Sequence, residues 1–164
     1  MNTKLADLFK RVSLGVYVVG VTDSHRKSAF TAAWITQVSF NPLLLLVSVN
    51  PHGSTYPLLE SGGVFSVNVL GQDQPELARH FGTPGLLDKL AGIHWQGGVT
   101  GCPLLDDALA WFECEVSAIH PAGDHVIVLG QVVAGELRYP DRLPLIYRDT
   151  GNMDGAERFY PLSL

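Results

Sequence analysis

Two segments of the chain combine side-chain hydroxyls with small residues, a mixture suited to binding a flat polar ring or a phosphate. Residues 31–39 read TAAWITQVS, and residues 48–55 read SVNPHGST. Small side chains let backbone N–H groups approach a ring edge, and hydroxyls at a helix start suit a phosphate. Composition alone favours the alternative that these are ordinary turn and helix-capping residues.

Familiar catalytic motifs do not occur in the sequence. It contains no G-x-S-x-G, H-E-x-x-H, G-x-x-x-x-G-K-[ST] or G-x-G-x-x-G pattern. These patterns are the entry features of serine hydrolases, zincins, nucleoside triphosphatases and Rossmann proteins. The sequence therefore does not favour any of these four classes.

Histidines and cysteines are scattered rather than clustered. His120 and His125 could face each other across a hairpin, but no cysteine or acidic residue is spaced to complete a metal site. We therefore expect no bound metal. Cys102 and Cys114 lack C-x-x-C spacing, so we expect both to be buried free thiols.

Short elements, mostly strands, must position the two segments. Apolar residues at helical spacing predict a helix over residues 5–12. Strands joined as a hairpin are expected at residues 16–22 and 29–35. Residues 43–49 are apolar at nearly every position, which predicts a central strand buried on both faces.

Capping residues mark two more helices. Ser54 is expected to cap a short helix that runs to Leu59. Asp73 and Glu76 form a capping-box pattern for a helix that ends near His80. The glycine-rich residues 83–101 show no clear period and predict a long loop.

The remaining strands complete an antiparallel pattern. They are expected at residues 64–70, 108–120, 125–137 and 143–147, with residues 121–124 as the turn of a long hairpin. About seven strands, brief helices and no regular βαβ alternation predict an all-β dominated fold, a closed or nearly closed antiparallel barrel. We expect residues 1–164 to form a single domain.

Charged residues are scarce, and this scarcity bears on partners. They make up 16% of the 164 residues, whereas hydrophobic residues make up 46%; the net charge is −5. A small monomer normally covers its surface with charge, so a homodimer is expected. The acidic balance disfavours nucleic acid and anionic membranes, and no apolar run could span a bilayer. The expected location is the cytoplasm.

Five pieces in order resemble the flavin reductase-like family, and together they cover about residues 8–150. They are FTAAWITQVSFNP at residues 30–42, ST at 54–55, GVFSVNVL at 63–70 followed by Gln74, Leu77, Ala78 and Phe81, GDHVIVLGQV at 123–132, and PLIY at 144–147. This resemblance implies an FMN-binding split barrel that works as a homodimer, with the flavin at the subunit interface.

The resemblance also implies a reaction and its cosubstrates. NADH or NADPH would deliver a hydride to FMN, with FAD as the alternative flavin, and reduced flavin could pass to a partner monooxygenase. The protein would mainly hold the two rings in register, and backbone donors near the flavin would stabilise the charge of the reduced ring. His125 would lie near the nicotinamide. The expected cofactor-binding residues are Thr31, Ala32, Ala33, Trp34, Ile35, Thr36, Ser48, Val49, Asn50, Ser54, Thr55 and Phe81.

Several alternatives stay open. The chain could be an FMN-binding electron carrier or sensor without nicotinamide oxidation, or a split barrel that binds another flat cofactor such as haem. His125 could be a surface residue whose ring is hydrogen-bonded to Asp124. Trp34 stands where relatives commonly carry a small or polar residue, so its ring could stack on the flavin or block the nicotinamide. Arg79 and Lys89 are the candidate cations for the phosphate.

Overall fold

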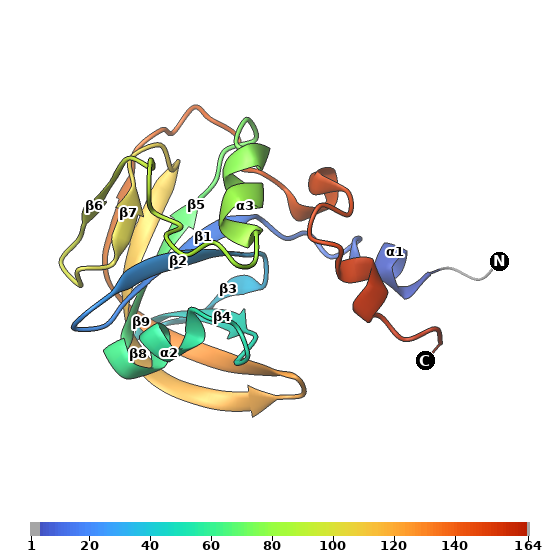
Figure 1. Ribbon diagram of the computed structural model, residues 1–164, viewed down its shortest axis with the longest axis horizontal. Helices are drawn as coiled ribbons and strands as arrows, with labels where there is room; N and C mark the ends of the chain where they lie inside the picture. The colour runs from blue at the N-terminus through green and yellow to red at the C-terminus, as the bar shows by residue number, and fades with distance from the viewer. Residues whose placement is uncertain (1–3, 164) are drawn as a thin grey trace.

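A seven-stranded antiparallel sheet forms the body of the protein (Figure 1). The computed structural model describes residues 4–163. The strand order is β2-β1-β5-β8-β9-β4-β3, and a separate pair, β6-β7, lies beside it. The elements in chain order are α1 Leu5–Phe9, β1 Tyr17–Thr22, β2 Lys27–Ala32, β3 Ile35–Phe40, β4 Leu43–Val49, α2 Tyr56–Gly62, β5 Val64–Val69, α3 Pro75–Gly82, β6 Trp95–Gly97, β7 Pro103–Leu105, β8 Ala110–Ala122 and β9 His125–Leu137. Two 3₁₀ turns follow, Tyr147–Thr150 and Ala156–Phe159.

The sheet closes on itself at Ala33 and Trp34. Strands β2 and β3 lie at opposite ends of the strand order, yet only these two residues separate them in the chain. The sheet must therefore curl until its two edges meet. The predicted antiparallel split barrel is confirmed.

Alternating apolar residues fill the barrel. Val19, Val47, Phe65 and Val128 are fully or almost fully buried in one core cluster, together with Leu59 from α2. A second cluster lies under α3 and includes Val18, Leu70 and Phe81. The period of two places alternate side chains of β1, β4 and β5 in the barrel core, whereas Val18, Ser66 and Asn68 are buried on the opposite face of β1 and β5.

Strand β4 corrects one prediction. It was expected to be buried on both faces, but Leu45, Val47 and Val49 are buried while Leu44 and Leu46 are only half-buried. The strand lies next to the sheet edge. One of its faces therefore looks into the barrel, and the other stays partly accessible.

Both predicted helix caps are wrong. Helix α2 begins after Thr55, not Ser54, and no side chain caps it. Helix α3 begins after Gln74, again without a side-chain cap. The Asp73 carboxylate, predicted as the cap, instead accepts a 2.7 Å hydrogen bond from Arg142. A long-range ion pair has displaced the local capping interaction.

The predicted loop at residues 83–101 contains a strand that the sequence did not reveal. Strand β6 pairs with β7 and lies over the large sheet, where the buried Glu113 carboxylate accepts hydrogen bonds from the amides of Val99 and Thr100. The predicted strand at residues 143–147 is wrong, since only the isolated bridges Gly71–Pro144 and Gly15–Ile146 form there.

The two ends of the chain form a lobe that projects from the barrel (Figure 1). Helix α1 and residues 147–160 build it, joined by a 2.7 Å ion pair between Lys10 and Glu157 and by the rings of Phe9 and Tyr160, 5.5 Å apart. Large apolar side chains of the lobe remain exposed, among them Leu8, Val12 and Phe159.

Candidate functional site

Three adjacent strands bring the predicted site residues together at one end of the barrel. The Ser48 amide donates a 3.0 Å hydrogen bond to the Trp34 carbonyl, which ties the start of β3 to the end of β4. On the other side of β4, Val49 pairs with Val126 of β9. His125 therefore lies beside the end of β4, close to Trp34 and Ser48, which are far from it in the sequence.

The Trp34 indole and the His125 imidazole pack against each other at this point. Their ring centroids are 4.9 Å apart with an interplanar angle of 50°. The Nδ1 atom of His125 lies 2.6 Å from the Asp124 carboxylate, and this hydrogen bond lowers the pKa of Asp124. Trp34 is 47% exposed, so one side of its ring remains accessible.

Backbone donors are available where the sheet closes. Within residues 4–163, the amides of Ala33 and Trp34 lie between the two strand ladders and donate to no other group of the chain. The neighbouring side chains of Ala32 and Ala33 are small. Free N–H groups beside an accessible aromatic ring fit the polar edge of a flat cofactor such as a flavin.

The two threonines predicted to contact the cofactor differ in availability. The Thr31 hydroxyl donates a 2.6 Å hydrogen bond to the Ala78 carbonyl of α3, so it could only accept a further hydrogen bond from a ligand. Thr36 is exposed, and its hydroxyl makes only a long 3.4 Å contact with the Gln37 carbonyl. Thr31 thus fixes α3 against β2.

The turn before α2 offers two further amides. Among the described residues, the N–H groups of Ser54 and Thr55 donate to no other group, whereas the Asn50 carboxamide oxygen accepts from the His52 amide at 2.9 Å. Ser54 is exposed and Thr55 is buried.

The two candidate cations for a phosphate also differ. The Lys89 ammonium is buried and donates to the Phe81 carbonyl at 2.9 Å, where it caps the C-terminal end of α3. Burial lowers the pKa of Lys89. Arg79 is exposed and lies 3.5 Å from Glu76.

Three predicted contact residues have no free side chain at the site. Phe81 is fully buried in the core under α3, so its predicted place in the nicotinamide pocket does not hold. The side chains of Ile35 and Val49 point into the barrel core, which leaves only their backbone atoms for a ligand.

His120 and His125, which could have faced each other across the hairpin, do not pair. His120 pairs with Ile127, whereas His125 pairs with Ala122, because the hairpin turn contains only Gly123 and Asp124. Within residues 4–163, no three histidine, cysteine or acidic residues come together as a metal site. The hydrogen bond between His125 and Asp124, which the sequence offered as an alternative for His125, is present at 2.6 Å, and the His125 side chain is 24% exposed.

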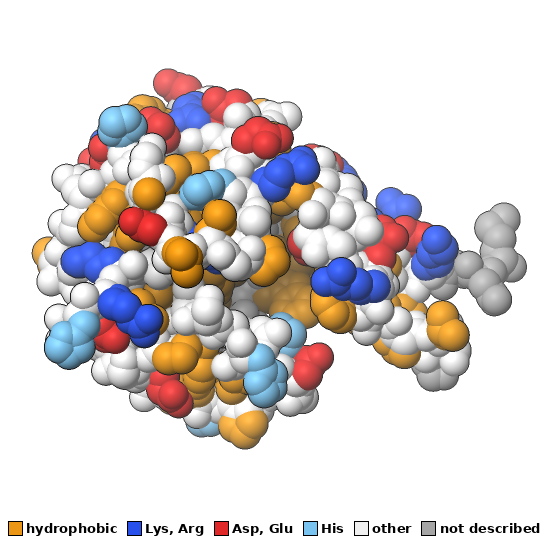
Figure 2. Space-filling view, in the orientation of Figure 1, with side chains coloured by type: hydrophobic (Ala, Val, Ile, Leu, Met, Phe, Trp, Pro, Cys, Tyr) orange, Lys and Arg blue, Asp and Glu red, His pale blue; other side chains and the backbone are white. Residues whose placement is uncertain are grey.

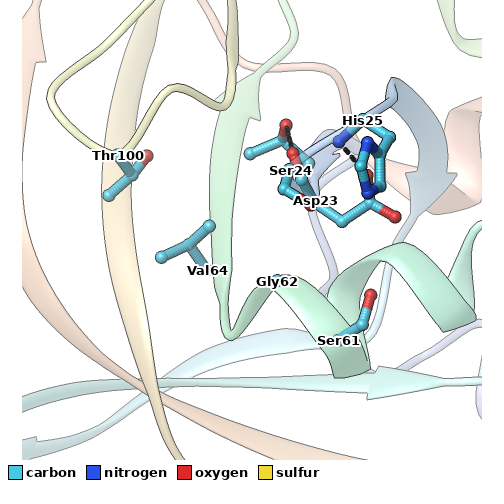
Figure 3. A pocket seen from close by; sticks show the side chains of 8 residues that line it. Asp23, Ser24, His25, Ser61, Gly62, Val64 and Thr100 are labelled. Atoms are coloured by element: carbon cyan, nitrogen blue, oxygen red, sulfur yellow. Dashed lines mark hydrogen bonds between the residues drawn. The ribbon is translucent and has the colours of Figure 1, made fainter.

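A hollow with a hydrophobic floor separates the barrel from the terminal lobe (Figure 2). Figure 1 has the same orientation and shows that this hollow lies near α3 and the β3–β4 hairpin. A separate pocket of about 480 Å³ lies between the β1–β2 turn and the end of α2 (Figure 3). Its lining is mostly polar, and Asp23 there already accepts hydrogen bonds from the His25 and Arg26 amides. None of the candidate site residues lines that pocket, so we assign the site to the closure of the barrel.

The fold and the site define an antiparallel split barrel with free backbone donors at its closure. The family described as "Flavin reductase like domain" matches residues 9–156, and the chain therefore belongs to the flavin reductase-like family. None of the helices in residues 4–163 is long and apolar enough to cross a membrane.

Relatives with related names cover most of this chain. A "Probable flavin reductase" of Rhizobium meliloti is 41% identical over 133 residues, 80% of this chain and 42% of that protein. An "FMN reductase (NADH)" of Enterobacter cloacae is 33% identical over 147 residues, 88% of each chain. Among solved structures, the NADH:FAD oxidoreductase of Streptomyces globisporus has a TM-score of 0.79 and 33% identity, covering 87% of this chain and 86% of that one. The chain thus spans less than half the length of the first relative.

Proposed function

We propose that this protein catalyses the reduction of a flavin by NADH or NADPH. The observation that carries this proposal is the junction of the two barrel edges, where the amides of Ala33 and Trp34, unpaired within residues 4–163, lie beside the packed, tilted rings of Trp34 and His125. Relatives named FMN reductase (NADH) and NADH:FAD oxidoreductase support it, as does a structure of the latter with NAD and FAD fragments.

Each part of the site has a proposed task. The amides of Ala33 and Trp34 donate to the polar edge of the flavin, and the exposed hydroxyl of Thr36 adds a further contact. The end of β4 at Ser48 and Asn50 meets the ring edge or the ribityl chain. The amides of Ser54 and Thr55, which are unpaired within residues 4–163, and the hydroxyls of the same two residues receive the phosphate, with FMN as the expected flavin and FAD as the alternative.

The reaction demands little acid–base chemistry from the protein. A bound flavin accepts a hydride directly from the reduced nicotinamide. The chain's own work is to hold both rings, to exclude water from between them, and to place donors where negative charge develops. His125 contacts the nicotinamide in this proposal. A site without a catalytic triad or metal is therefore sufficient for the reaction.

A separate oxygenase is the proposed consumer of reduced flavin. One structure with 32% identity and a TM-score of 0.76 is BorF, the flavin reductase component of a bacterial two-component tryptophan halogenase. Another, with 29% identity and a TM-score of 0.79, is component B of a nitrilotriacetate monooxygenase.

The single-domain organisation and the cytoplasmic location remain predictions from the sequence.

A homodimer is the proposed working unit. Edge strand β3 and the start of β4 expose the apolar side chains Val38, Phe40 and Leu43, of which Phe40 is 89% exposed. The half-buried outer side chains of β4 continue this surface, which we call the β3–β4 face. A second copy that covers this face would remove apolar area from water and enclose the neighbouring flavin site.

Anaerobic mixing of the flavin-loaded protein with NADH or NADPH tests the function. We expect the absorbance of oxidised flavin near 450 nm to bleach within seconds to minutes. Bleaching by dithionite but by neither nicotinamide would contradict the reductase and support an electron carrier. An FMN-binding protein of Thermus thermophilus, 30% identical with a TM-score of 0.77, makes the carrier the relevant second candidate.

A further inference from the structure

A tight turn places an acidic side chain directly against the His125 ring. Ala122 and His125 form the last pair of the β8–β9 hairpin, so the turn consists of Gly123 and Asp124 alone. Gly123 has a φ of 65°, a conformation that glycine adopts without strain at the first position of a two-residue turn. Asp124 thereby occupies the second position, and its carboxylate reaches Nδ1 of the adjacent His125 at 2.6 Å.

The contact determines which nitrogen of His125 carries the proton. An ionised carboxylate can only accept a hydrogen bond. The pKa of Asp124 is lowered, chiefly by this same contact, so the carboxylate is ionised at neutral pH. Nδ1 must therefore be the donor, and a neutral His125 keeps Nε2 unprotonated. No group in residues 4–163 hydrogen-bonds to that Nε2 atom.

Trp34 restricts the same ring from a second direction. Its indole lies 4.9 Å from the imidazole, and the His125 side chain is only 24% exposed, whereas Asp124 is 93% exposed. A ring held on one face by an indole and at one nitrogen by a carboxylate has little freedom to flip. Its other nitrogen then keeps one direction, which a ligand-contacting group requires.

We propose that Asp124 is a positioning residue, which acts through His125 by fixing its Nδ1–H tautomer and its orientation against Trp34. Part of this inference rests on the proposed function, because the value of a fixed Nε2 lies in contact with the nicotinamide. The tautomer itself does not depend on any ligand. The two parts can therefore be tested separately.

NMR of the ligand-free protein tests the tautomer. At a pH near 8.5, where ordinary imidazoles are neutral, long-range ¹H–¹⁵N spectra distinguish the Nδ1–H from the Nε2–H form. His80 is an internal control, since its Nε2 lies 2.7 Å from the Lys89 carbonyl, an acceptor that requires the opposite tautomer. We expect Nδ1–H for His125 and Nε2–H for His80. Replacing Asp124 by Ala should convert only the His125 signals to a mixture, and unchanged His125 signals would overturn the proposal.

A double-mutant cycle tests the functional part. We expect Asp124→Ala to lower kcat/KM for the nicotinamide about tenfold in the wild-type background. In a His125→Ala background the same change should cost less than about twofold, because the group it positions is gone. Equal losses in both backgrounds would show that Asp124 only stabilises the turn and would overturn the positioning role. Asp141→Ala, at an exposed aspartate beyond β9, is the matched control. If the wild-type protein oxidises neither nicotinamide, the proposed function fails, while the NMR result still decides the tautomer.

Discussion

The indole of Trp34 packs on the imidazole of His125, with 4.9 Å between ring centroids, although Trp34 lies directly before β3 and His125 starts β9. This contact exists because β4 lies between these two strands and pairs with both. It makes Trp34 the tryptophan that should report on ligand binding.

Trp34 fluorescence should therefore be quenched by a flavin bound at the barrel closure. Quenching falls steeply with distance, and the other two tryptophans, Trp95 and Trp111, lie outside the site. We expect Trp34→Phe to remove most of the quenching during an FMN titration, while Trp95→Phe and Trp111→Phe retain it. Loss of quenching in either control variant instead would place the flavin elsewhere.

The turn at Ser54 and Thr55 should select for a phosphate. Changing both residues to Val should weaken FMN binding by about 1.5–3 kcal/mol for each charge-assisted hydrogen bond lost from a hydroxyl. Riboflavin, which has no phosphate, should bind both proteins equally well. Equilibrium dialysis with the two ligands measures the difference, and an equal loss for both would mean that the phosphate does not lie at this turn.

The β3–β4 face should mediate dimerisation. Phe40 and Leu43 are exposed on it, so replacing both with Glu should dissociate the proposed dimer through buried, unpaired charge. Light scattering coupled to size-exclusion chromatography measures the mass. Leu87→Glu is the control, because Leu87 is fully exposed in the loop between α3 and β6, outside β3 and β4. A monomeric wild-type protein would contradict the proposal.

Glu113 should be a major contributor to stability. Its buried carboxylate accepts hydrogen bonds from the Val99 and Thr100 amides at 3.0 and 2.8 Å and from the Thr100 hydroxyl at 2.6 Å. Glu113→Ala leaves these donors unpaired and should lower the free energy of unfolding by about 3 kcal/mol. Urea titration measures the change. Glu115→Ala, at an exposed position of the same strand, should be nearly neutral.

Docking of the terminal lobe should depend on pH. The Lys10 ammonium lowers the pKa of Glu157, so the pair stabilises the lobe above the ordinary value of 4.5 and loses this effect as pH falls through the lowered pKa. Glu157 in turn raises the pKa of Lys10, so the effect persists up to 10.5 and disappears as pH rises further. Hydrogen-exchange protection factors of residues 147–160 measure docking. Glu157→Gln should remove the loss of protection at low pH. If the Glu157→Gln variant still loses protection at low pH as the wild type does, other groups cause that loss.

Local patterns predicted much of the fold. The alternation along residues 64–70 and the turn residues around Gly123 predicted β5 and the β8–β9 hairpin nearly to the residue, since side-chain period and turn chemistry are local properties. The same reasoning failed at Asp73. There a capping pattern competes with Arg142, a partner far along the chain that no local rule reveals.

By itself, the sequence determined several of the long strands, the family and the segments that carry the candidate site, because these follow from residue order and short-range periodicity. Only the tertiary structure decided that Trp34, Ser48 and His125 meet, that Phe81 is buried in the core and that Lys89 caps α3. Closing a sheet brings its two edges together through packing of the whole core. The neighbours across that closure depend on every strand between them, and no single stretch of sequence contains that information.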